Sequence, residues 1–498
     1  MASCGRELHQ MQRTEARASR QFPAVAPRHV GRALCAAAWL ASGLSHPVAA
    51  QPPAADQELR GRVVGIESAG VLRLDSGARV RLQGVSLPAE PVRPASADAA
   101  LCRWLRDRLL GRSVVVQLDV RDRFGGTGTV RLAERGASIN AQLLRDGLAL
   151  LSCRTARVAA LAELSAAARA AQQARAGWFG STPGRRDRAL PELRGAVLGL
   201  HHQEPQRDYH RQLDELVGLG FEHVCLLFSM FVERVDSSEI IRTHKRTVTD
   251  ARLIETIAYA RRRGLSVMLL PILLILSPGA DDWRGKLRPK DERAFWRSYD
   301  RMLAHYLDIA EHGGVELFSI GSELGSLEDR TATWERILEN ARGRYRGFLT
   351  YSANWDHGHV GRFFGKLDVL GMTAYFSLTK KTDPTVDELV KEWQRVGVEL
   401  RKIAARHRCK IVFTELGYAS QDGINRDPWN YTMNKDRIDL REQADCFTAF
   451  LRVAPSFEFL AGAYFYDYYD AGGEKDWSYS PRGKPALELW RRWARGGR

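Results

Sequence analysis

The sequence predicts a (β/α)8 barrel in its C-terminal part, preceded by a smaller domain built around an OB-type β-barrel. Two observations carry this prediction. After residue 193, eight short apolar segments alternate with amphipathic helical segments through to the C-terminus. Before residue 180, short alternating segments are separated by glycines, a pattern typical of a small β-rich domain.

Chain length and net charge limit the number of domains and the class of partner that we expect. At 498 residues the chain is too long for one ordinary domain, and its 44% hydrophobic content is that of a globular protein. The formal net charge of +15 comes mostly from arginines scattered through helical stretches. No basic block interleaves with aromatic residues, so we expect no specific nucleic-acid partner.

The N-terminus has the pattern of a secretion signal. Arg28 and Arg32 precede the apolar stretch 33–44, and Val48 and Ala50 fit a signal-peptidase site. We therefore predict a signal peptide and leader over residues 1–50 and a periplasmic or secreted protein. An alanine-rich helix in a disordered leader is the alternative. No other segment is apolar for about 20 residues, so no membrane span is expected.

Cysteine usage indicates neither a metal nor a redox site. Cys102 and Cys153 could pair in an exported protein. Cys225, Cys409 and Cys446 lie in apolar settings typical of small core residues. None of the seven cysteines has CxxC spacing, and we expect no metal and no cofactor.

The front domain is predicted over residues 59–180. Its expected strands lie at residues 61–66, 70–77, 78–88 and 113–120, and its expected helices at 97–111, 138–151 and 156–180. The stretch "STPGRRDRALPEL" that follows predicts a linker over residues 181–192.

Three stretches of this domain, "RVRLQGVSLPAE", "DRFGGTGTVRL" and "INAQLLRDGLALL", resemble the staphylococcal-nuclease-like fold, an OB-type barrel with helices. In that family a calcium ion and arginines cleave phosphodiesters. Here Arg81 matches one family arginine, while Gly126 stands where the second is expected. Ser68–Val71 and Val85–Ala89 replace the acidic motifs, and Glu90 is displaced by one position. Without a carboxylate cluster for the metal, we expect a spacer or binding module and not a nuclease.

Eight strands are predicted for the second domain, over residues 193–498. They lie at residues 195–200, 223–229, 266–273, 315–321, 348–353, 367–375, 410–417 and 461–468. Helices are expected between them, for example at residues 209–220, 250–264, 293–314 and 386–407. A doubly wound open sheet is the structural alternative, but no glycine-rich phosphate turn follows any strand.

Two glutamates end predicted strands. Glu323 follows the fourth strand in "FSIGSELGS", and Glu415 ends the seventh in "KIVFTELGYAS". Function in such barrels gathers at the C-terminal ends of the strands, and a pair of carboxylates there can cleave a glycosidic bond. A solvated strand end is the ordinary alternative for either glutamate.

Aromatic residues cluster at the same strand ends and can stack on sugar rings. Trp283, Trp355, Trp429 and Tyr466 are the candidates in loops or at strand ends, and we also expect Tyr418 near the mouth. The other aromatic residues there are Tyr375, Tyr468, Tyr469 and Trp477. Tryptophans inside predicted helices are expected to pack in the core: Trp296, Trp334, Trp393 and Trp490.

This half resembles clan A glycoside hydrolases, and in particular the β-mannanase-like glycoside hydrolase family 113. The matching pieces include "DDWRGKLRP", "IGSEL", "LTYSANWDH", "DVLGMTAYFSL", "FTELGY" and "YSPRGKPALELWRRW". The resemblance implies that Glu323 is the general acid/base and Glu415 the nucleophile of a retaining double displacement. It also implies that Tyr375 orients the nucleophile and that Asn354 and Trp355 line the cleft.

The chain departs from this family at three places around the site. Ser322 stands where many clan A enzymes have asparagine, and Leu270–Ile272 replaces a common Lys-Pro-His. The eighth strand ends in the tyrosine-rich "YFYDYYD" instead of tryptophan. The leading hypothesis is therefore an exported retaining glycoside hydrolase on a β-linked polysaccharide, either mannan-like or an exopolysaccharide. The alternatives are a carbohydrate-binding pseudoenzyme and a secreted calcium-dependent nuclease.

Overall fold

The computed structural model describes residues 58–68, 70–87, 97–122, 125–134, 138–151, 158–177, 189–200, 209–243, 246–432, 434–468 and 472–496. Structural statements below concern these residues. The predicted signal peptide, most of the predicted linker, Glu90 and Tyr469 lie outside them. Cys153 does too, while the Cys102 thiol is free.

The front domain contains a closed five-stranded barrel in the order β1-β2-β3-β6-β5. The strands are β1 (Glu58–Ser68), β2 (Val71–Leu74), β3 (Arg79–Leu82), β5 (Ser113–Asp122) and β6 (Gly125–Leu132). Alternate residues such as Leu72, Val80, Val116 and Val130 are fully buried in the barrel interior. The period-2 pattern of the sequence therefore fills one small core.

Three helices accompany this barrel: α2 (Ala97–Leu109), α3 (Ile139–Arg145) and α4 (Val158–Ala174). The predicted helix at 138–151 is too long. It ends at Arg145, because Gly147 adopts a left-handed φ of +65° that stops the helix. Leu150–Leu151 then forms β7, which pairs with β4 (Val85–Ser86).

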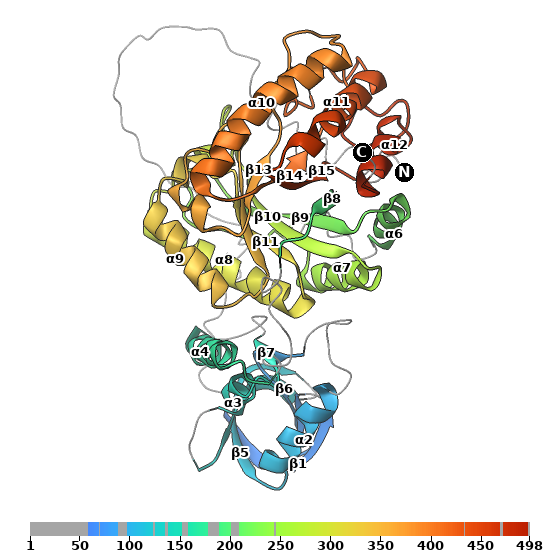
Figure 1. Cartoon of the computed structure of the whole chain (residues 1–498). Coiled ribbons are helices and arrows are strands. Elements are labelled where there is room, and N and C mark those ends of the chain that lie inside the picture. The colour runs from blue at the N-terminus through green and yellow to red at the C-terminus, as the bar shows by residue number, and fades with distance from the viewer. Residues whose placement is uncertain are drawn as a thin grey trace, which may run out of the picture.

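The second domain is a closed barrel of eight parallel strands in the order β10-β11-β12-β13-β14-β15-β8-β9, as predicted. The strands are β8 (Leu193–Gly199), β9 (His223–Val232), β10 (Ser266–Ile275), β11 (Leu317–Ser322), β12 (Phe348–Ala353), β13 (Leu370–Thr373), β14 (Ile411–Leu416) and β15 (Leu460–Phe465). The surrounding helices are α6 (His210–Leu219), α7 (Asp250–Arg262), α8 (Glu292–Gly313), α9 (Thr331–Arg342), α10 (Val386–His407), α11 (Leu440–Val453) and α12 (Ala486–Ala494) (Figure 1).

The unit after β12 lacks a full helix and has the 3₁₀ turn η4 (Arg362–Lys366) instead. Gly361 and Gly365 flank or interrupt this segment, and glycine disfavours helix. Phe363 and Phe364 are fully buried and cover this side of the barrel in place of a helical face. This unit therefore contributes buried aromatic side chains to the core although it has no α-helix.

The front domain lies next to the side of the large barrel that carries α8 and α9 (Figure 1). The Ser86 hydroxyl lies 2.7 Å from Nε2 of His312 at the end of α8. Gln172 of α4 donates to the carbonyl of Arg344, 2.8 Å away, just beyond α9. Since both helices end where the next strand begins, these contacts lie at the base of the barrel. No described helix is long and apolar enough to cross a membrane.

Candidate active site

Glu323 follows directly on β11 at the C-terminal rim of the barrel. Its backbone adopts a left-handed φ of +52°, which costs a non-glycine residue about 1–2 kcal/mol. The conformation is held by a hydrogen bond of 2.8 Å from the Glu323 N–H to the Ser352 carbonyl. The residue is only 5% exposed, so this strand end is not a solvated one.

Both carboxylate oxygens of Glu323 are engaged. The Thr373 hydroxyl at the end of β13 donates to Oε1 at 2.6 Å. Oε2 forms an ion pair with the guanidinium of Arg284, which stands on the 3₁₀ turn η2 (Arg284–Lys286) after β10. Asn354 lies beside this group, because its Oδ1 is 3.4 Å from the Thr373 hydroxyl.

Glu415 is the fifth residue of β14 and is also 5% exposed. The Tyr375 hydroxyl donates to its Oε2 at 2.8 Å, as the resemblance implied. Thr373 and Tyr375 are two residues apart on one segment, and they hold Glu323 and Glu415 respectively. The two glutamates are therefore brought to the same rim of the barrel.

Burial and the charge of Glu323 govern the protonation of Glu415. Desolvation raises the pKa of Glu415 to about 7, and the negative charge of Glu323 adds to the rise. Arg284 and the Tyr375 hydrogen bond act in the opposite direction without cancelling it. The neutral form of Glu415 is therefore more populated near neutral pH than that of an exposed glutamate, a perturbation typical of functional sites.

A third carboxylate, Asp467, lies near Glu415. It follows β15, is 4% exposed, and its Oδ1 has no hydrogen-bond partner. Burial, followed by the charge of Glu415, raises the pKa of Asp467 well above its ordinary range. The sequence prediction missed this residue, although it stands in "YFYDYYD", where the chain departs from the family pattern.

The predicted tryptophans form two exposed faces. Trp355 stacks on Trp429 with ring centroids 5.9 Å apart and an interplanar angle of 16°. Trp429 is 45% exposed and Trp283 is 36% exposed. The Trp283 ring packs against the backbone of Gly285, where a Cβ would lie 2.4 Å from the ring. These positions suit aromatic platforms for sugars.

Tyr466 belongs to a cluster of tyrosines around the Glu415 side of the site. Its ring lies edge-on to Tyr375 at 6.2 Å and to Tyr479 at 5.2 Å. Tyr479, which comes from the loop before α12, was not among the residues predicted for the site. Tyr375 and Tyr466 thus lie side by side at the ends of their strands.

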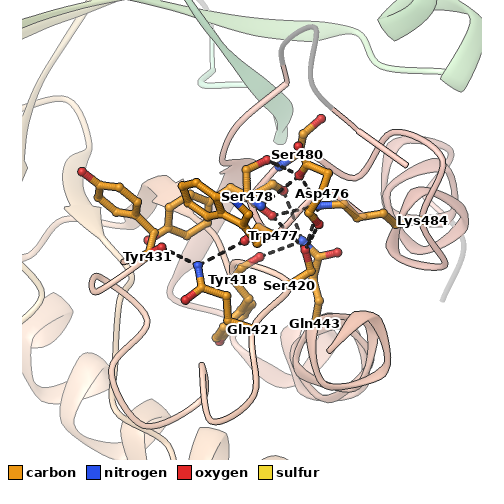
Figure 2. Close-up of polar contacts among 11 residues, drawn as sticks. Tyr418, Ser420, Gln421, Tyr431, Gln443, Asp476, Trp477, Ser478, Ser480 and Lys484 are labelled. Carbon is orange, nitrogen blue, oxygen red and sulfur yellow. Dashed lines mark hydrogen bonds and ion pairs between the residues drawn. The ribbon is translucent and has the colours of Figure 1, made fainter. Parts of the chain in front are cut away.

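The loop that carries Tyr479 is anchored by a fully buried lysine (Figure 2). Lys484 donates to Asp476 at 2.7 Å and to the Ser420 hydroxyl at 2.8 Å. Burial lowers the pKa of Lys484, while Asp476 opposes that shift. Because Ser420 lies in the loop after β14, this contact fixes the tyrosine cluster relative to Glu415.

Two tyrosines do not belong to the mouth. Tyr418 is fully buried, and its ring packs edge-on against Phe447 of α11, so the prediction that it lies near the mouth is wrong. Tyr468 turns outward and donates to Glu215 of α6 at 2.7 Å. The helical tryptophans are core residues as predicted: Trp296, Trp334, Trp393 and Trp490 are all buried.

With this geometry established, comparison with known proteins identifies the barrel. The profile of glycoside hydrolase family 113 matches residues 200–481, more than half of the chain. The chain belongs to glycoside hydrolase family 113. The profile of staphylococcal nuclease homologues matches residues 79–179 in the front domain. No sequence among the curated proteins matches the chain.

Solved family 113 structures are similar over the barrel. The family 113 β-mannanase of Alicyclobacillus acidocaldarius, in complex with ManMIm, is 26% identical, with a TM-score of 0.55. The match covers 62% of this chain and 99% of that one. A complex structure of a family 113 β-1,4-mannanase, 22% identical with a TM-score of 0.55, covers 61% of this chain and 99% of its own and agrees in fold.

The nuclease-like domain places its charges differently from a metal site. The described residues Ser68, Gly70 and Val71 of the first altered motif bring no carboxylate to the β1–β2 turn. The carboxylate of the neighbouring Glu67 forms an ion pair with the guanidinium of Arg79, 2.6 Å away. Arg81 is exposed on β3.

The raised pKa of Glu415 predicts a stability effect of its substitution. The folded state binds the proton more tightly than an unfolded glutamate with its ordinary pKa of 4.5, so stability falls as pH rises from about 4.5 to about 7. Glu415→Gln removes this cost and should stabilise the protein by up to about 3 kcal/mol above pH 7. Thermal unfolding at pH 8 and pH 5 tests this. A gain as large at pH 5 as at pH 8 would contradict it.

Proposed function

We propose that this family 113 protein is a retaining glycoside hydrolase that cleaves a β-linked polysaccharide by double displacement. The observation that carries the proposal is the pair Glu323 and Glu415, held by Thr373 and Tyr375 on one segment of the rim. Each glutamate is nearly buried, and the charge of Glu323 adds to the raised pKa of Glu415. This is what two cooperating carboxylates at one glycosidic bond require.

Glu415 attacks the anomeric carbon while Glu323 gives its proton to the departing oxygen, which leaves a glycosyl ester on Glu415 and a free alcohol. Glu323 then takes a proton from water, and the water oxygen replaces Glu415 at the anomeric carbon. Both glutamates return to their starting states. Tyr375 holds Glu415 in line by its 2.8 Å hydrogen bond.

The remaining site residues suit binding of a polymer. Trp283 and the stacked pair Trp355 and Trp429 offer exposed faces for sugar rings. Asn354 and Tyr466 lie beside the two glutamates and line the sugar position. The similar solved proteins are β-mannanases, which supports a mannan-like polymer or another β-linked exopolysaccharide. The leader pattern of the sequence supports export to the periplasm or beyond.

A carbohydrate-binding pseudoenzyme is the second candidate, favoured by the altered residues at the site, such as Ser322 and Asp467. Screening the protein against β-mannan, glucomannan and bacterial exopolysaccharides, with analysis of released sugars, separates the two. Release of reducing ends from at least one polymer supports hydrolysis. Binding to a polymer with no release from any of them would leave the pseudoenzyme.

A secreted nuclease is a third reading, tied to the front domain. Incubation of the full chain with DNA and calcium tests it, with Arg81→Ala as the matched variant. We expect no cleavage by either form. Cleavage that depends on calcium and disappears in Arg81→Ala would instead establish nuclease activity.

A further inference from the structure

The left-handed backbone of Glu323 has to be held by its surroundings. Its φ of +52° lies in a region that residues with a side chain occupy only where neighbouring contacts impose it. Thr373 and Arg284 contact the carboxylate at the far end of the side chain. These two residues position the carboxyl group, whereas the backbone needs contacts of its own.

Two consecutive residues of β12 provide these backbone contacts. The Ser352 carbonyl accepts a hydrogen bond of 2.8 Å from the N–H of Glu323. The Tyr351 hydroxyl accepts one of 2.9 Å from the N–H of Leu324. These N–H groups belong to the two peptide units that flank the Cα of Glu323, where the backbone has only two soft dihedral angles. Glu323 therefore cannot leave the left-handed region unless one of these peptide units rotates and gives up its hydrogen bond.

The Tyr351 hydroxyl is oriented by a buried carboxylate. An N–H can only donate, so the Tyr351 oxygen accepts from Leu324 and its single proton needs another acceptor. That acceptor is Oε1 of Glu328, 2.8 Å away. Burial, followed by the charge of Glu328, raises the pKa of Tyr351 well above its ordinary range, so the hydroxyl keeps its proton. The direction of both hydrogen bonds is thus fixed, and each strengthens the other.

Glu328 closes the turn that begins at Glu323. It is fully buried and follows the 3₁₀ turn η3 (Gly325–Leu327). Its Oε2 lies 3.1 Å from Nδ1 of His357, and this hydrogen bond raises the pKa of the imidazole. A positively charged partner therefore lies beside the buried carboxylate. The His357 ring also covers Gly325, where a Cβ would lie 2.7 Å from the ring.

We infer that Tyr351, oriented by Glu328 and His357, is a positioning residue: its hydroxyl holds the peptide unit after Glu323 and thereby keeps the general acid/base at the glycosidic oxygen. The inference rests on the proposed function, because it takes Glu323 as the acid/base residue. It adds a hydrogen-bonded network behind the strand that the substrate does not have to touch.

Kinetics with two leaving groups test the inference. Tyr351→Phe keeps the ring packed against Trp334 and Phe363 and removes only the hydroxyl. For an oligosaccharide, whose leaving group needs the acid, kcat/KM should fall at least about tenfold. For a dinitrophenyl glycoside, whose leaving group needs no proton, kcat/KM should fall less than about threefold. Equal losses on both substrates, or no loss on the oligosaccharide, would overturn the inference.

Tyr345→Phe is the matched control. The Tyr345 ring is also fully buried, and its hydroxyl donates to the Val315 carbonyl at 2.8 Å, just before the opposite end of β11. This variant therefore also loses a buried hydrogen bond, but one remote from Glu323. We expect both substrates to respond to it equally.

Hydrogen exchange tests the contact without turnover. Mass spectrometry of deuterium uptake over residues 317–328 reports on the N–H of Leu324. Loss of its acceptor in Tyr351→Phe should let about one amide in this segment exchange at least about tenfold faster. Tyr345→Phe should leave exchange in the segment unchanged. Unchanged exchange in Tyr351→Phe would contradict the proposed role of the hydroxyl.

Glu328→Leu is the second variant, and it serves if Tyr351→Phe does not fold. It keeps the tyrosine but removes the acceptor of its proton, so the hydroxyl can turn away from Leu324. The oligosaccharide should again lose more, by about threefold or more in kcat/KM. Glu328→Gln, whose amide oxygen can accept the same proton, should stay within about twofold of wild type. The same result for the leucine and glutamine variants would overturn the inference.

Failure of the proposed function looks different. The wild-type protein would then release no product from any substrate, while Tyr351→Phe would still speed exchange at Leu324. Product release by wild type, together with unchanged exchange in Tyr351→Phe, would overturn the inference and leave the proposed function standing.

Discussion

Glu415→Ala is expected to lower kcat/KM by on the order of 10⁴-fold or more on every substrate that the protein cleaves. The variant has no nucleophile to form the glycosyl ester, so even an aryl glycoside with an excellent leaving group should not react. Released sugar and aryl alcohol, measured against wild type, give the result. Glu399→Ala, on the exposed face of α10, is a matched glutamate control that should retain full activity.

Loss of activity in Glu415→Ala must be separated from loss of fold. Because Glu415 is buried, its truncation to alanine leaves a cavity and an unpaired Tyr375 hydroxyl, so thermal unfolding of Glu415→Ala is measured beside that of the isosteric Glu415→Gln. A folded variant that keeps more than a tenth of wild-type activity would contradict the nucleophile assignment.

Glu323→Ala is expected to have the second largest effect, and one that depends on the leaving group. On an oligosaccharide, loss of the general acid should lower kcat/KM by about 10²–10⁴-fold. On a dinitrophenyl glycoside, whose leaving group needs no proton, the first step should be nearly unaffected and hydrolysis of the glycosyl ester should become rate-limiting. Added azide should then raise the rate, because this anion attacks the ester without base assistance.

The azide product also reports the geometry. Attack on the ester from the face opposite Glu415 gives a β-glycosyl azide from a β-glycoside. The same loss of rate on the oligosaccharide and the dinitrophenyl glycoside, with no response to azide, would show that Glu323 is not the acid/base residue.

The barrel and its two glutamates were predictable because they depend on local patterns. Eight apolar runs specify buried parallel strands, and a glutamate that ends such a run is conspicuous in "FTELGY". Tyr375 followed from a motif resemblance. These are features that a short stretch of chain carries by itself.

The site features that were not predicted depend on contacts between segments that are distant in the sequence. Arg284 lies 39 residues before Glu323, and nothing local indicates that the two side chains form an ion pair. Thr373 could equally have been one more β-branched residue of a strand. Tyr418 was predicted to lie near the mouth of the barrel, but the loop after β14 directs its ring toward Phe447 of the surrounding helix α11.

The short front-domain helix shows the same limit. The helical periodicity of the sequence continues past Arg145. The helix nevertheless ends there, because Gly147 has a left-handed backbone and Leu150–Leu151 pairs with β4 as a strand. The docking of this domain at the base of the barrel also depends on single contacts, such as that of Ser86 with His312. Neither the end of this helix nor the docking of the domain can be predicted from the composition or from the spacing of residues.

The most direct test of double displacement by Glu323 and Glu415 is the anomeric form of the product at the start of the reaction. Proton NMR during cleavage of a β-linked oligosaccharide, recorded before mutarotation, shows which anomer forms first. We expect the β-anomer, because two inversions at one carbon restore its configuration. The α-anomer as first product would contradict the account.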